Sequence, residues 1–600
     1  MSTKIVERHE VPVNDTWDLE SIFKSDTEWE QSATTFKEQV SEIDGFRNKL
    51  SESAETLYLA LSKQLELQEK LGQIFTYAHM RHDQDTGNSY YSALQDKAYG
   101  LVSLFEQRAS YITPELLAMD PATLDRFVTE HKDLQLFSHL FDQLRKQREH
   151  ILSEREEELL ARAKEALNTS SQAYGALNNA DLAFPSIKNE KGEEVQITHG
   201  RFVSLLQSED RDVRKAAFEA VYATYEQYKN TFAATLSGQV KSDIFNAQSR
   251  NYASAREAAL SETHIPVGVY DQLISTVEDH LPLLHRYVKL RKKCLGVDEL
   301  HMYDLYTPII KDVEFQVSYE EAKQKVIEAV KPLGEEYVER LTQGFEDRWV
   351  DIHENKGKRS GAYSSGAYGT KPFILMNWQD DVDNLFTLAH EFGHSMHSDY
   401  TRRTQPYLYG DYTIFVAEVA STLNESLLHH HMIQTLEEKE KKLYILNYFL
   451  EGFRGTVFRQ TMFAEFEQMI HEKVEGGGAL TAEELTQMYY ELNVKYYGPD
   501  MVVDKEIGFE WARIPHFYYN FYVFQYATGY SAAAALSKQI LEEGQPAVDR
   551  FIDFLKTGSS DYPIQMLKKA GVDMTTSEPV EQAMKLFETT LDQIEQLIND

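Results

Sequence analysis

The chain has 600 residues and a formal net charge of −35, which argues against nucleic acids and anionic membrane surfaces as partners because both would repel it. Its length predicts two or more lobes, and no apolar run approaches the roughly 18 to 20 residues that span a bilayer. A single cysteine excludes an intrachain disulfide and the N-terminus lacks the apolar core of a signal peptide, so we expect a cytoplasmic protein.

The first third of the chain has the apolar spacing of amphipathic helices. From residue 20 to about 175, apolar residues recur every three or four positions, which predicts successive helices. Residues 182–198 break this pattern and are typical of two short strands joined by a turn at Asn189–Gly192. Helical spacing resumes at Ser208, and Ser208–Arg211 can serve as the capping region of the next helix. We therefore place a domain boundary near residue 200.

The middle of the chain changes character. A loop rich in Ser, Tyr and Gly precedes a strand-like run at Pro372–Trp378. Proline at the start of a strand removes a donor from the ladder, so this strand is predicted at the edge of a sheet. Asp383 or Asn384 can then cap a helix that continues to about Tyr400. Further along, Thr481–Glu484 has the capping-box pattern of another helix start.

The helix after that strand carries His390-Glu-Phe-Gly-His394, a His-Glu-x-x-His motif. Residues four apart lie on one helix face, so both imidazoles can reach one zinc ion. Glu391 lies about 100° around the helix from His390, where it can act as general base on a water without being a ligand. The motif arises by chance in roughly 6% of sequences of this composition, so two solvated surface histidines remain an alternative here.

A third ligand is predicted downstream. Glu418 lies on a second helical segment, 24 residues beyond His394, and a set of two histidines and one glutamate leaves the fourth position of a catalytic zinc open. His397 is the rival, but it lies about 10 Å along the helix axis from His390. One helix cannot easily wrap three ligands around an ion, so we favour Glu418. Glu425 can orient a ligand or form a solvent-facing salt bridge.

An aromatic stretch lies towards the end of the chain. Pro515 can start a helix on which Tyr518, Tyr522, Tyr526 and Tyr530 recur every four residues, forming a stripe on one face. A zinc peptidase needs hydrogen-bond donors for the oxyanion that forms on the scissile carbonyl, and phenol and imidazole groups can fill this role. For the stripe as a whole, packing in the core is the simpler interpretation.

Six segments spread over most of the chain carry a specific combination of residues: Trp17–Leu19, His301–Tyr306, Asn355–Tyr363, Lys371–Phe373, Leu388–His397 and Ile514–Tyr522. In this combination the chain resembles the thimet oligopeptidase family, and within it the bacterial oligoendopeptidase F branch. The resemblance implies a mainly α-helical, two-lobed, zincin-like fold that encloses a deep channel, with a small β-sheet beside the zinc helix. We assign residues 1–200 to an N-terminal helical lobe covering the cleft and residues 201–600 to the catalytic domain.

The resemblance also implies roles for individual residues. The matching positions are His390, His394 and Glu418 for the metal ligands, Glu391 for the base, and His516, Tyr522 and Tyr526 for contacts to the substrate and its oxyanion. The better-known branch of the family has a Gly-Gly-Tyr sequence after the substrate-binding histidine, which this chain lacks after His516. Among the tyrosines after that histidine, Tyr522 and Tyr526 are our choices for this role.

The predicted activity is a zinc-dependent endopeptidase with one Zn²⁺ per chain and short peptides as partners. The resemblance implies that it hydrolyses internal bonds of peptides of roughly 6 to 20 residues. Folded proteins should be spared, because they would first have to unfold locally to enter a channel as extended chain. The substrate backbone is expected to pair with the strand at Pro372–Trp378. Two alternatives are a non-catalytic helical peptide-binding protein and a zinc hydrolase of non-peptide amides.

Overall fold

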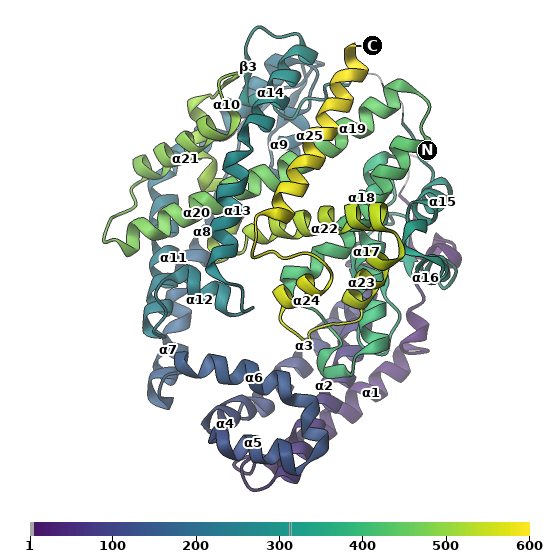
Figure 1. Ribbon diagram of the computed structural model, residues 1–600, viewed down its shortest axis with the longest axis vertical. Coiled ribbons are helices and arrows are strands. Elements are labelled where there is room, and N and C mark those ends of the chain that lie inside the picture. Colours follow the sequence, from purple (N-terminus) through teal and green to yellow (C-terminus); the bar gives the residue numbers. More distant parts are fainter. Residues whose placement is uncertain (1–4, 311–312, 314, 600) are drawn as a thin grey trace. The chain divides into compact units, whose positions relative to one another are not determined.

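The computed structural model describes residues 5–310, 313 and 315–599 and is mainly α-helical, as predicted (Figure 1). It divides into two compact units, each assembled from three separate stretches of chain. Unit 1 comprises Met1–Glu149, Phe315–His431 and Leu536–Gly571, and unit 2 comprises His150–Glu314, Met432–Ala535 and Val572–Asp600. In the described part of the chain, no helix combines the length and the apolar character that a membrane span requires. The domain boundary near residue 200 stays a prediction.

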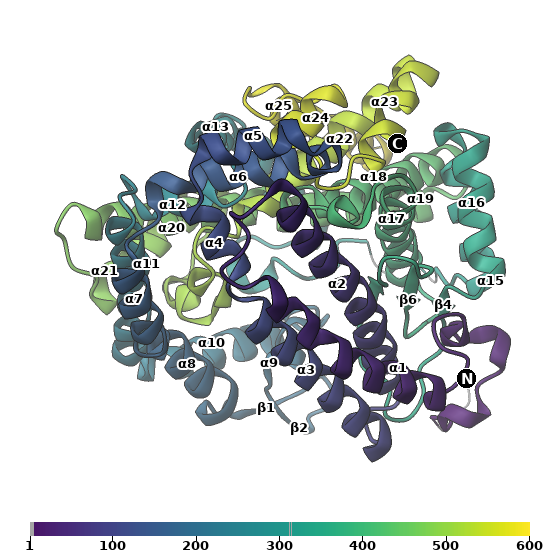
Figure 2. The ribbon, with the colours of Figure 1, turned by 90° about the horizontal axis from the view of Figure 1, so that it is seen from below.

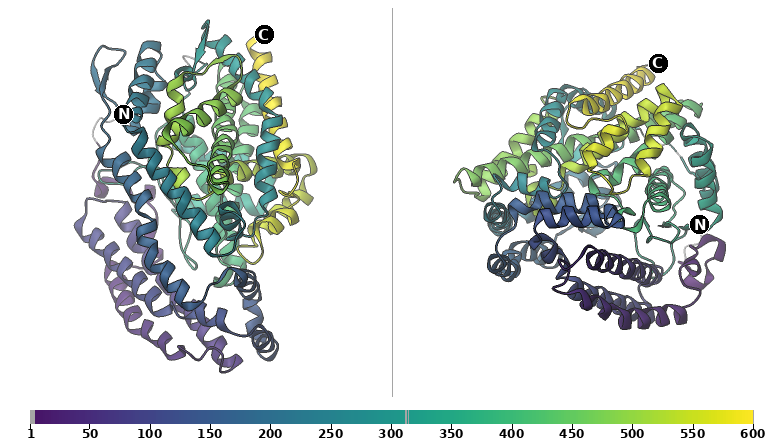
Figure 3. Two further views of the ribbon diagram at one scale, coloured as in Figure 1. Left: turned by 90° about the vertical axis from the view of Figure 1, so that its left-hand side faces the viewer. Right: turned by 60° about the horizontal axis from the view of Figure 1, so that its bottom comes forward.

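Unit 1 holds the helix with the His-Glu-x-x-His motif. Its helices are α1 (Asp26–Gln39), α2 (Ala54–Asp83), α3 (Ser89–Ala109), α4 (Ile112–Ala118), α5 (Pro121–Glu130), α6 (Ser138–Gln147), α15 (Tyr319–Ala329), α16 (Glu335–Glu346), α17 (Val382–Thr404), α18 (Ile414–Thr435, which continues into unit 2), α23 (Gln545–Leu555) and α24 (Pro563–Lys569). The first three of these run side by side (Figure 3). Ser25, Ser53 and Asn88 cap them, because each side chain accepts a hydrogen bond from a backbone N–H in the first turn.

A small sheet lies beside α17, as the family resemblance implied (Figure 2). Its strand order is β4-β6-β5, with β4 (Val350–Asp351) parallel and β5 (Tyr363–Ser365) antiparallel to β6 (Phe373–Leu375). The predicted edge position of β6 is therefore wrong, since β6 is the central strand. Pro372 precedes the strand, and the backbone N–H groups of Ile374 and Met376 complete the ladder by donating to Trp349 and Asp351.

Strand β5, which lies in the glycine-rich loop, was not predicted from the sequence. Among the described residues, β6 is its only strand partner, so the other side of β5 is a free edge. Gly366, with a φ of 152°, follows the strand directly. A Cβ atom there would lie 2.9 Å from the backbone oxygen of Lys371, so a larger residue would disturb the loop that joins β5 to β6.

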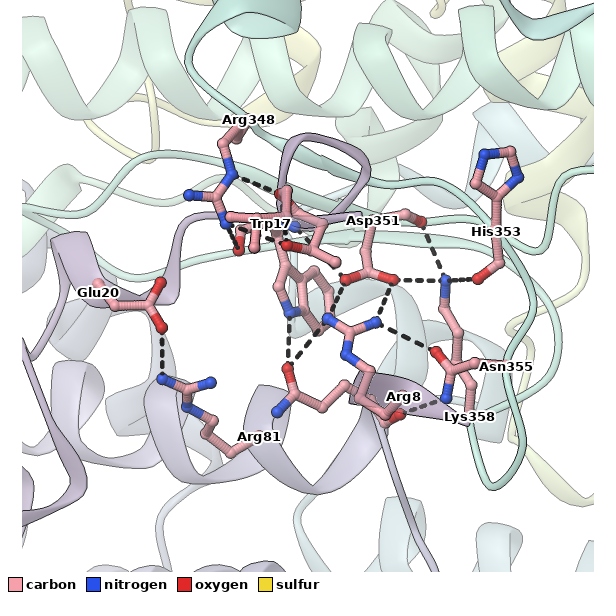
Figure 4. Close-up of polar contacts among 12 residues, drawn as sticks. Arg8, Trp17, Glu20, Arg81, Arg348, Asp351, His353, Asn355 and Lys358 are labelled. Carbon is pink, nitrogen blue, oxygen red and sulfur yellow. Dashed lines mark hydrogen bonds and ion pairs between the residues drawn. The ribbon is translucent and has the colours of Figure 1, made fainter. Parts of the chain in front are cut away.

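A buried ion cluster attaches the N-terminal segment to this sheet (Figure 4). The side chain of Asp351 is fully buried and accepts hydrogen bonds from Arg8 at 2.8 and 2.5 Å. The ammonium group of Lys358, also fully buried, lies 2.6 Å from the same carboxylate. The backbone N–H of Trp17 donates to it as well, at 3.4 Å. The cluster thus joins two of the segments that carry the family resemblance, Trp17–Leu19 and Asn355–Tyr363.

Unit 2 is also mainly helical (Figure 1). Its helices are α7 (Glu154–Leu167), α8 (Thr169–Ala176), α9 (His199–Leu206), α10 (Arg211–Gln227), α11 (Lys229–Ser249), α12 (Ala255–Ser261), α13 (Val267–Asp279), α14 (Leu281–Leu295), α19 (Lys439–Phe453), α20 (Arg459–Glu475), α21 (Ala482–Tyr497), α22 (Phe524–Glu543, which continues into unit 1) and α25 (Glu578–Asn599). The predicted capping box at the start of α21 is confirmed.

Two short sheets complete unit 2. The predicted hairpin is confirmed, with β1 (Ser186–Lys188) antiparallel to β2 (Glu194–Gln196) and Gly192 in the turn at a φ of 77°. Strands β3 (Leu300–His301) and β7 (Met501–Val502) form a parallel pair. Helix α9 was not predicted. Asp210, within the predicted capping region Ser208–Arg211, caps α10 by accepting a hydrogen bond from the backbone N–H of Asp212.

Candidate functional site

The His-Glu-x-x-His motif lies in the middle of α17. Asp381 caps this helix, so the predicted caps Asp383 and Asn384 are wrong, and both residues lie in the first turn. Gly393 of the motif faces α18 so closely that a Cβ atom there would lie 2.4 Å from the Cα atom of Ser421. The amide of Asn424 on α18 also donates to the backbone oxygen of Ala389, at 3.2 Å. The glycine therefore allows backbone-to-backbone packing of the two helices, which brings Glu418 to the histidines.

Three side chains converge on one point between these helices. The Nε2 atoms of His390 and His394 lie 3.1 Å apart, and Oε2 of Glu418 lies 3.3 and 3.5 Å from them. A tetrahedral zinc with ligand distances of about 2.0–2.1 Å separates its ligand atoms by about 3.3–3.4 Å. Two nitrogens and one carboxylate oxygen at this spacing fit a zinc ion with one position left open. Among the described residues, this is the one group of three or more metal-ligating side chains whose donor atoms converge.

Glu425 orients the first histidine. Its carboxylate oxygen lies 2.6 Å from Nδ1 of His390, which donates to it, so the Nε2 lone pair points at the convergence point. Glu425 was predicted either to orient a ligand or to form a solvent-facing salt bridge. The structure has the first of these, a contact to a histidine of the motif. Burial lowers the pKa of His390, but hydrogen bonds to Glu418 and Glu425 outweigh this effect and raise it well above the ordinary value. A histidine ligand must be neutral, so binding of a metal ion at Nε2 would release the extra proton.

The pKa of Glu418 shifts in the opposite direction. Burial raises it, but hydrogen bonds from His390 and His394 dominate and lower it well below the ordinary range. His397, the rival ligand, lies elsewhere on α17. It is fully buried, and its ring stacks on Tyr412 with centroids 3.7 Å apart. Burial lowers its pKa to about 3, so the imidazole is neutral and packs as an aromatic side chain.

Glu391 is buried next to the histidines. Its carboxylate accepts a hydrogen bond from the backbone of Ser364, in the edge strand β5. Burial raises the pKa of Glu391, while the two histidines of the motif lower it. A carboxylate with a raised pKa exchanges a proton more readily near neutral pH. The contact between Ser364 and the glutamate was not predicted, because β5 lies in a segment whose glycines indicated a loop.

The aromatic residues proposed to contact the substrate belong to unit 2. Nε2 of His516 lies 3.4 Å from the hydroxyl of Tyr526, and the His516 ring lies parallel to that of Tyr522 at 6.3 Å between centroids. The rings of Tyr522 and Tyr526 are 5.5 Å apart. Burial lowers the pKa of His516, as does Arg459, so this imidazole favours the neutral form. The structure therefore brings together the three residues that the resemblance indicated.

The predicted tyrosine stripe on one helix is wrong. A short 3-10 helix, η13 (Pro515–Tyr518), ends at the first tyrosine, and α22 begins only at Phe524. Between them, Asn520 and Phe521 have φ values of 46° and 58°, which no right-handed helix contains. Tyr518 instead packs in the core and its hydroxyl lies 2.8 Å from that of Thr235. The fourfold spacing of the tyrosines therefore does not reflect one continuous helix.

Comparison with known proteins identifies relatives over the whole chain. A sequence profile of peptidase family M3 matches residues 204–586, and a profile of oligopeptidase F matches residues 115–184. Oligopeptidase PepF of Bacillus subtilis (strain 168) is 59% identical over 597 residues, which covers 100% of this chain and 89% of that protein. Group B oligopeptidase PepB of Streptococcus agalactiae is 46% identical and covers 97% of both chains.

Solved structures give the same result. A crystal structure of oligoendopeptidase F from Enterococcus faecium is 43% identical, with a TM-score of 0.74 over 96% of this chain and 99% of that one. A crystal structure from Chlamydophila abortus is 34% identical, with a TM-score of 0.93 over 99% of this chain and 100% of that one. Sequence, fold and the convergent histidines of α17 agree, and the chain belongs to peptidase family M3, in its oligoendopeptidase F branch.

Proposed function

We propose that the protein is a zinc-dependent endopeptidase that cleaves internal bonds of oligopeptides. The observation that supports this most directly is the convergence of two imidazole nitrogens and one carboxylate oxygen within 3.5 Å of one another, beside a buried glutamate. The names of the relatives, oligopeptidase and oligoendopeptidase, support peptides as the substrate class. Peptides of roughly 6 to 20 residues that can adopt an extended strand are the proposed substrates.

His390, His394 and Glu418 are the proposed ligands of one Zn²⁺ per chain. When bound, the ion supplies Lewis acidity, which polarises a water molecule and the scissile carbonyl. Glu425 keeps the His390 ring oriented through the Nδ1 hydrogen bond, and orienting contacts of this kind strengthen metal binding.

Glu391 is the proposed general base and acid. Its carboxylate removes a proton from the attacking water, whose oxygen forms the new bond to the carbonyl carbon. The same carboxyl then gives the proton to the amide nitrogen as the carbon–nitrogen bond breaks, so the leaving group departs as a neutral amine. The raised pKa of Glu391, caused by burial, favours both transfers near neutral pH.

His516, Tyr522 and Tyr526 are the proposed donors to the substrate. A neutral imidazole and two phenols each offer one hydrogen to a carbonyl oxygen that becomes negative in the transition state. Their mutual contacts support a shared role, because the His516–Tyr526 distance of 3.4 Å and the ring packing restrict all three side chains.

The free edge of β5 is the proposed docking place for the substrate backbone, in place of β6. An extended peptide can add to an exposed strand through main-chain hydrogen bonds, which select for extended chain and tolerate many side chains. Support comes from the contact between Ser364 in this strand and Glu391, since a peptide paired with β5 would lie beside the base. We also propose that the protein acts in the cytoplasm, which the single cysteine supports.

A peptide digest followed by mass spectrometry tests this function. A mixture of synthetic peptides of different lengths is incubated with the protein as purified, after chelation, and after chelation followed by added Zn²⁺. We expect internal cleavages that chelation stops and Zn²⁺ restores. Binding of peptides without cleavage in all three samples would support the peptide-binding alternative. Cleavage confined to small non-peptide amides would support the amide hydrolase.

A further inference from the structure

The turn between η13 and α22 has an unusual backbone. Asn520 and Phe521 both adopt positive φ values, 46° and 58°, in a protein where most residues of this kind are glycines. Side chains rarely occupy this region, and a bulky aromatic residue does so only where its surroundings enforce the conformation. The turn directly precedes Tyr522 and lies between His516 and Tyr526 in sequence. The contact that holds the turn therefore also fixes the position of the Tyr522 side chain.

One buried carboxylate holds this turn. The side chain of Glu467, on α20, is completely buried, and its Oε1 atom accepts a hydrogen bond of 2.7 Å from the backbone N–H of Phe521. That N–H group belongs to the left-handed residue itself. The bond therefore stabilises the strained conformation directly.

The surroundings of Glu467 fix it in turn. His471, one helical turn further on, donates from Nδ1 to the backbone oxygen of Glu467 at 2.8 Å. Its Nε2 atom lies 3.5 Å from Oδ2 of Asp243 on α11. The ring of His471 also packs on that of Phe521, with 4.5 Å between centroids, and Tyr270 covers the same phenyl ring at 5.6 Å. Side chains from two further helices thus enclose the carboxylate and the turn that it holds.

Burying an ionisable group such as Glu467 costs free energy, so packing alone does not explain a glutamate at this position. No lysine or arginine pairs with it among the interactions of the described residues, and burial raises its pKa to about 7 although His471 and the Phe521 N–H lower it. A leucine or methionine would fill the same space without an ionisable group. The specific contribution of the carboxylate is an acceptor oxygen placed at the N–H of the left-handed residue.

We propose that Glu467 is a positioning residue for peptide hydrolysis: through the backbone of Phe521 it fixes the turn that presents Tyr522 next to His516 and Tyr526. This inference rests on the proposed role of those three side chains as donors to the substrate. Glu467 itself touches none of the reacting groups in this scheme. All of the residues involved belong to unit 2.

Two variants of Glu467 distinguish the contribution of its hydrogen-bond acceptor from that of its side-chain volume. Glu467→Gln keeps the shape and an acceptor oxygen, whereas Glu467→Leu keeps the volume and removes the acceptor. Should the leucine variant fail to fold, Glu467→Asp withdraws the acceptor by one methylene group and takes its place. Ile470→Ala, a change of a buried residue on the same helix, is the matched control for a general loss of stability.

Hydrogen–deuterium exchange of the backbone amides of residues 519–523 is the first measurement. The leucine variant should exchange these amides at least tenfold faster than the wild type, while the glutamine and Ile470→Ala variants keep most of the protection. The second measurement is steady-state hydrolysis of a ten-residue peptide by the zinc-loaded enzyme. Here the leucine variant should lose at least tenfold in kcat with little change in KM, and Glu467→Gln should restore most of kcat.

Unchanged exchange in the leucine variant, or faster exchange with unchanged kcat, would overturn the inference. An equal loss of kcat in the glutamine and leucine variants would overturn it too, because the glutamine keeps the acceptor. His516→Ala and Tyr522→Phe test the proposed donor roles separately. If these two variants keep full activity, the donor assignment fails, whereas the exchange data still decide whether Glu467 holds the turn.

Discussion

Glu391 touches a backbone group of β5 and lies beside the two histidines of the motif, yet it is not one of the three converging donors. Glu391→Gln should therefore keep the metal and lose a factor of about 10² to 10⁴ in kcat, because the amide cannot accept the proton of the attacking water. Elemental mass spectrometry measures the zinc content of the variant. A peptide hydrolysis assay on the same preparation measures its kcat. Activity within threefold of the wild type would contradict the assignment.

Glu418 and His397 give opposite expectations for metal binding. Glu418→Ala removes one of the three converging donors and should abolish both stoichiometric zinc and activity. His397→Leu should keep the zinc, because the His397 ring is buried against Tyr412 and Phe554 and not directed at the other donors. Titration of each purified variant with Zn²⁺ against a competing chelator decides the matter. Loss of zinc from the leucine variant alone would make His397 the ligand.

Glu467 should also leave a signature in the pH dependence of stability. Burial raises its pKa from 4.5 to about 7, so between these values the unfolded chain releases a proton that the folded chain keeps. Stability contributed by this group is complete below pH 4.5 and falls as the pH rises to 7, by about 3 kcal/mol at 1.36 kcal/mol per pKa unit. Glu467→Gln cannot titrate and should lack this loss. Urea unfolding of both proteins at pH 5 and pH 8 measures the difference, and equal pH dependence would refute it.

Among the secondary-structure elements, the sheet beside α17 depends on a buried charge. Asp351→Asn leaves the fully buried ammonium group of Lys358 and the guanidinium group of Arg8 with a neutral partner. Breaking a buried ion pair from one side costs about 3–5 kcal/mol, so the variant should unfold at lower urea concentration. Lys63→Gln, which removes an ion pair with the exposed side chain of Glu42, is the control and should change stability by less than about 1 kcal/mol. Equal unfolding midpoints for the two variants would contradict the prediction.

Local patterns predicted those elements whose signals are local. The hairpin at β1 and β2 and the capping box of α21 follow from turn residues and side-chain caps, which act over three or four residues. The position of β6 did not follow, because the strands that flank it come from a glycine-rich loop and a two-residue segment. Strand pairing is decided by such distant partners, and two- or three-residue strands carry almost no periodic signal.

The aromatic stretch after Pro515 is a case in which a local pattern predicted an element that does not form. Spacing by four predicts a helix only if each intervening residue adopts helical angles, and Asn520 and Phe521 do not. The contact that holds them comes from Glu467, which is 54 residues away and indistinguishable in sequence from any helical glutamate. By contrast, the convergence of His390, His394 and Glu418 was predictable, because these residue types and spacings are the ones that zinc coordination and helix geometry require.

For the whole molecule, the proposed activity sets a limit on substrates. A peptide that pairs with β5 must be extended, and a folded protein can offer such a segment only after local unfolding, which is unfavourable in a stable domain. We expect cleavage of a ten-residue peptide and little cleavage of a native globular protein that contains the same sequence. Intact casein, which is long but loosely structured, tests the upper limit of about 20 residues separately from folding. Cleavage of casein at the rate of the short peptide would refute that limit.

The assembly of unit 1 from three distant stretches has a consequence for protein synthesis. Helix α17, which carries the His-Glu-x-x-His motif, packs on the last of these stretches. The hydroxyl of Thr401 donates to the backbone oxygen of Leu555, and the side-chain amide of Gln405 donates to that of Lys556. A ribosome-bound chain that has just released the motif still lacks these partners. Helix α17 reaches its final packing only after about 150 further residues have been translated, which takes about 8 to 30 s at 5–20 residues per second. Unfinished chains should therefore be poor peptidases, so that proteolytic activity appears only when synthesis is almost complete.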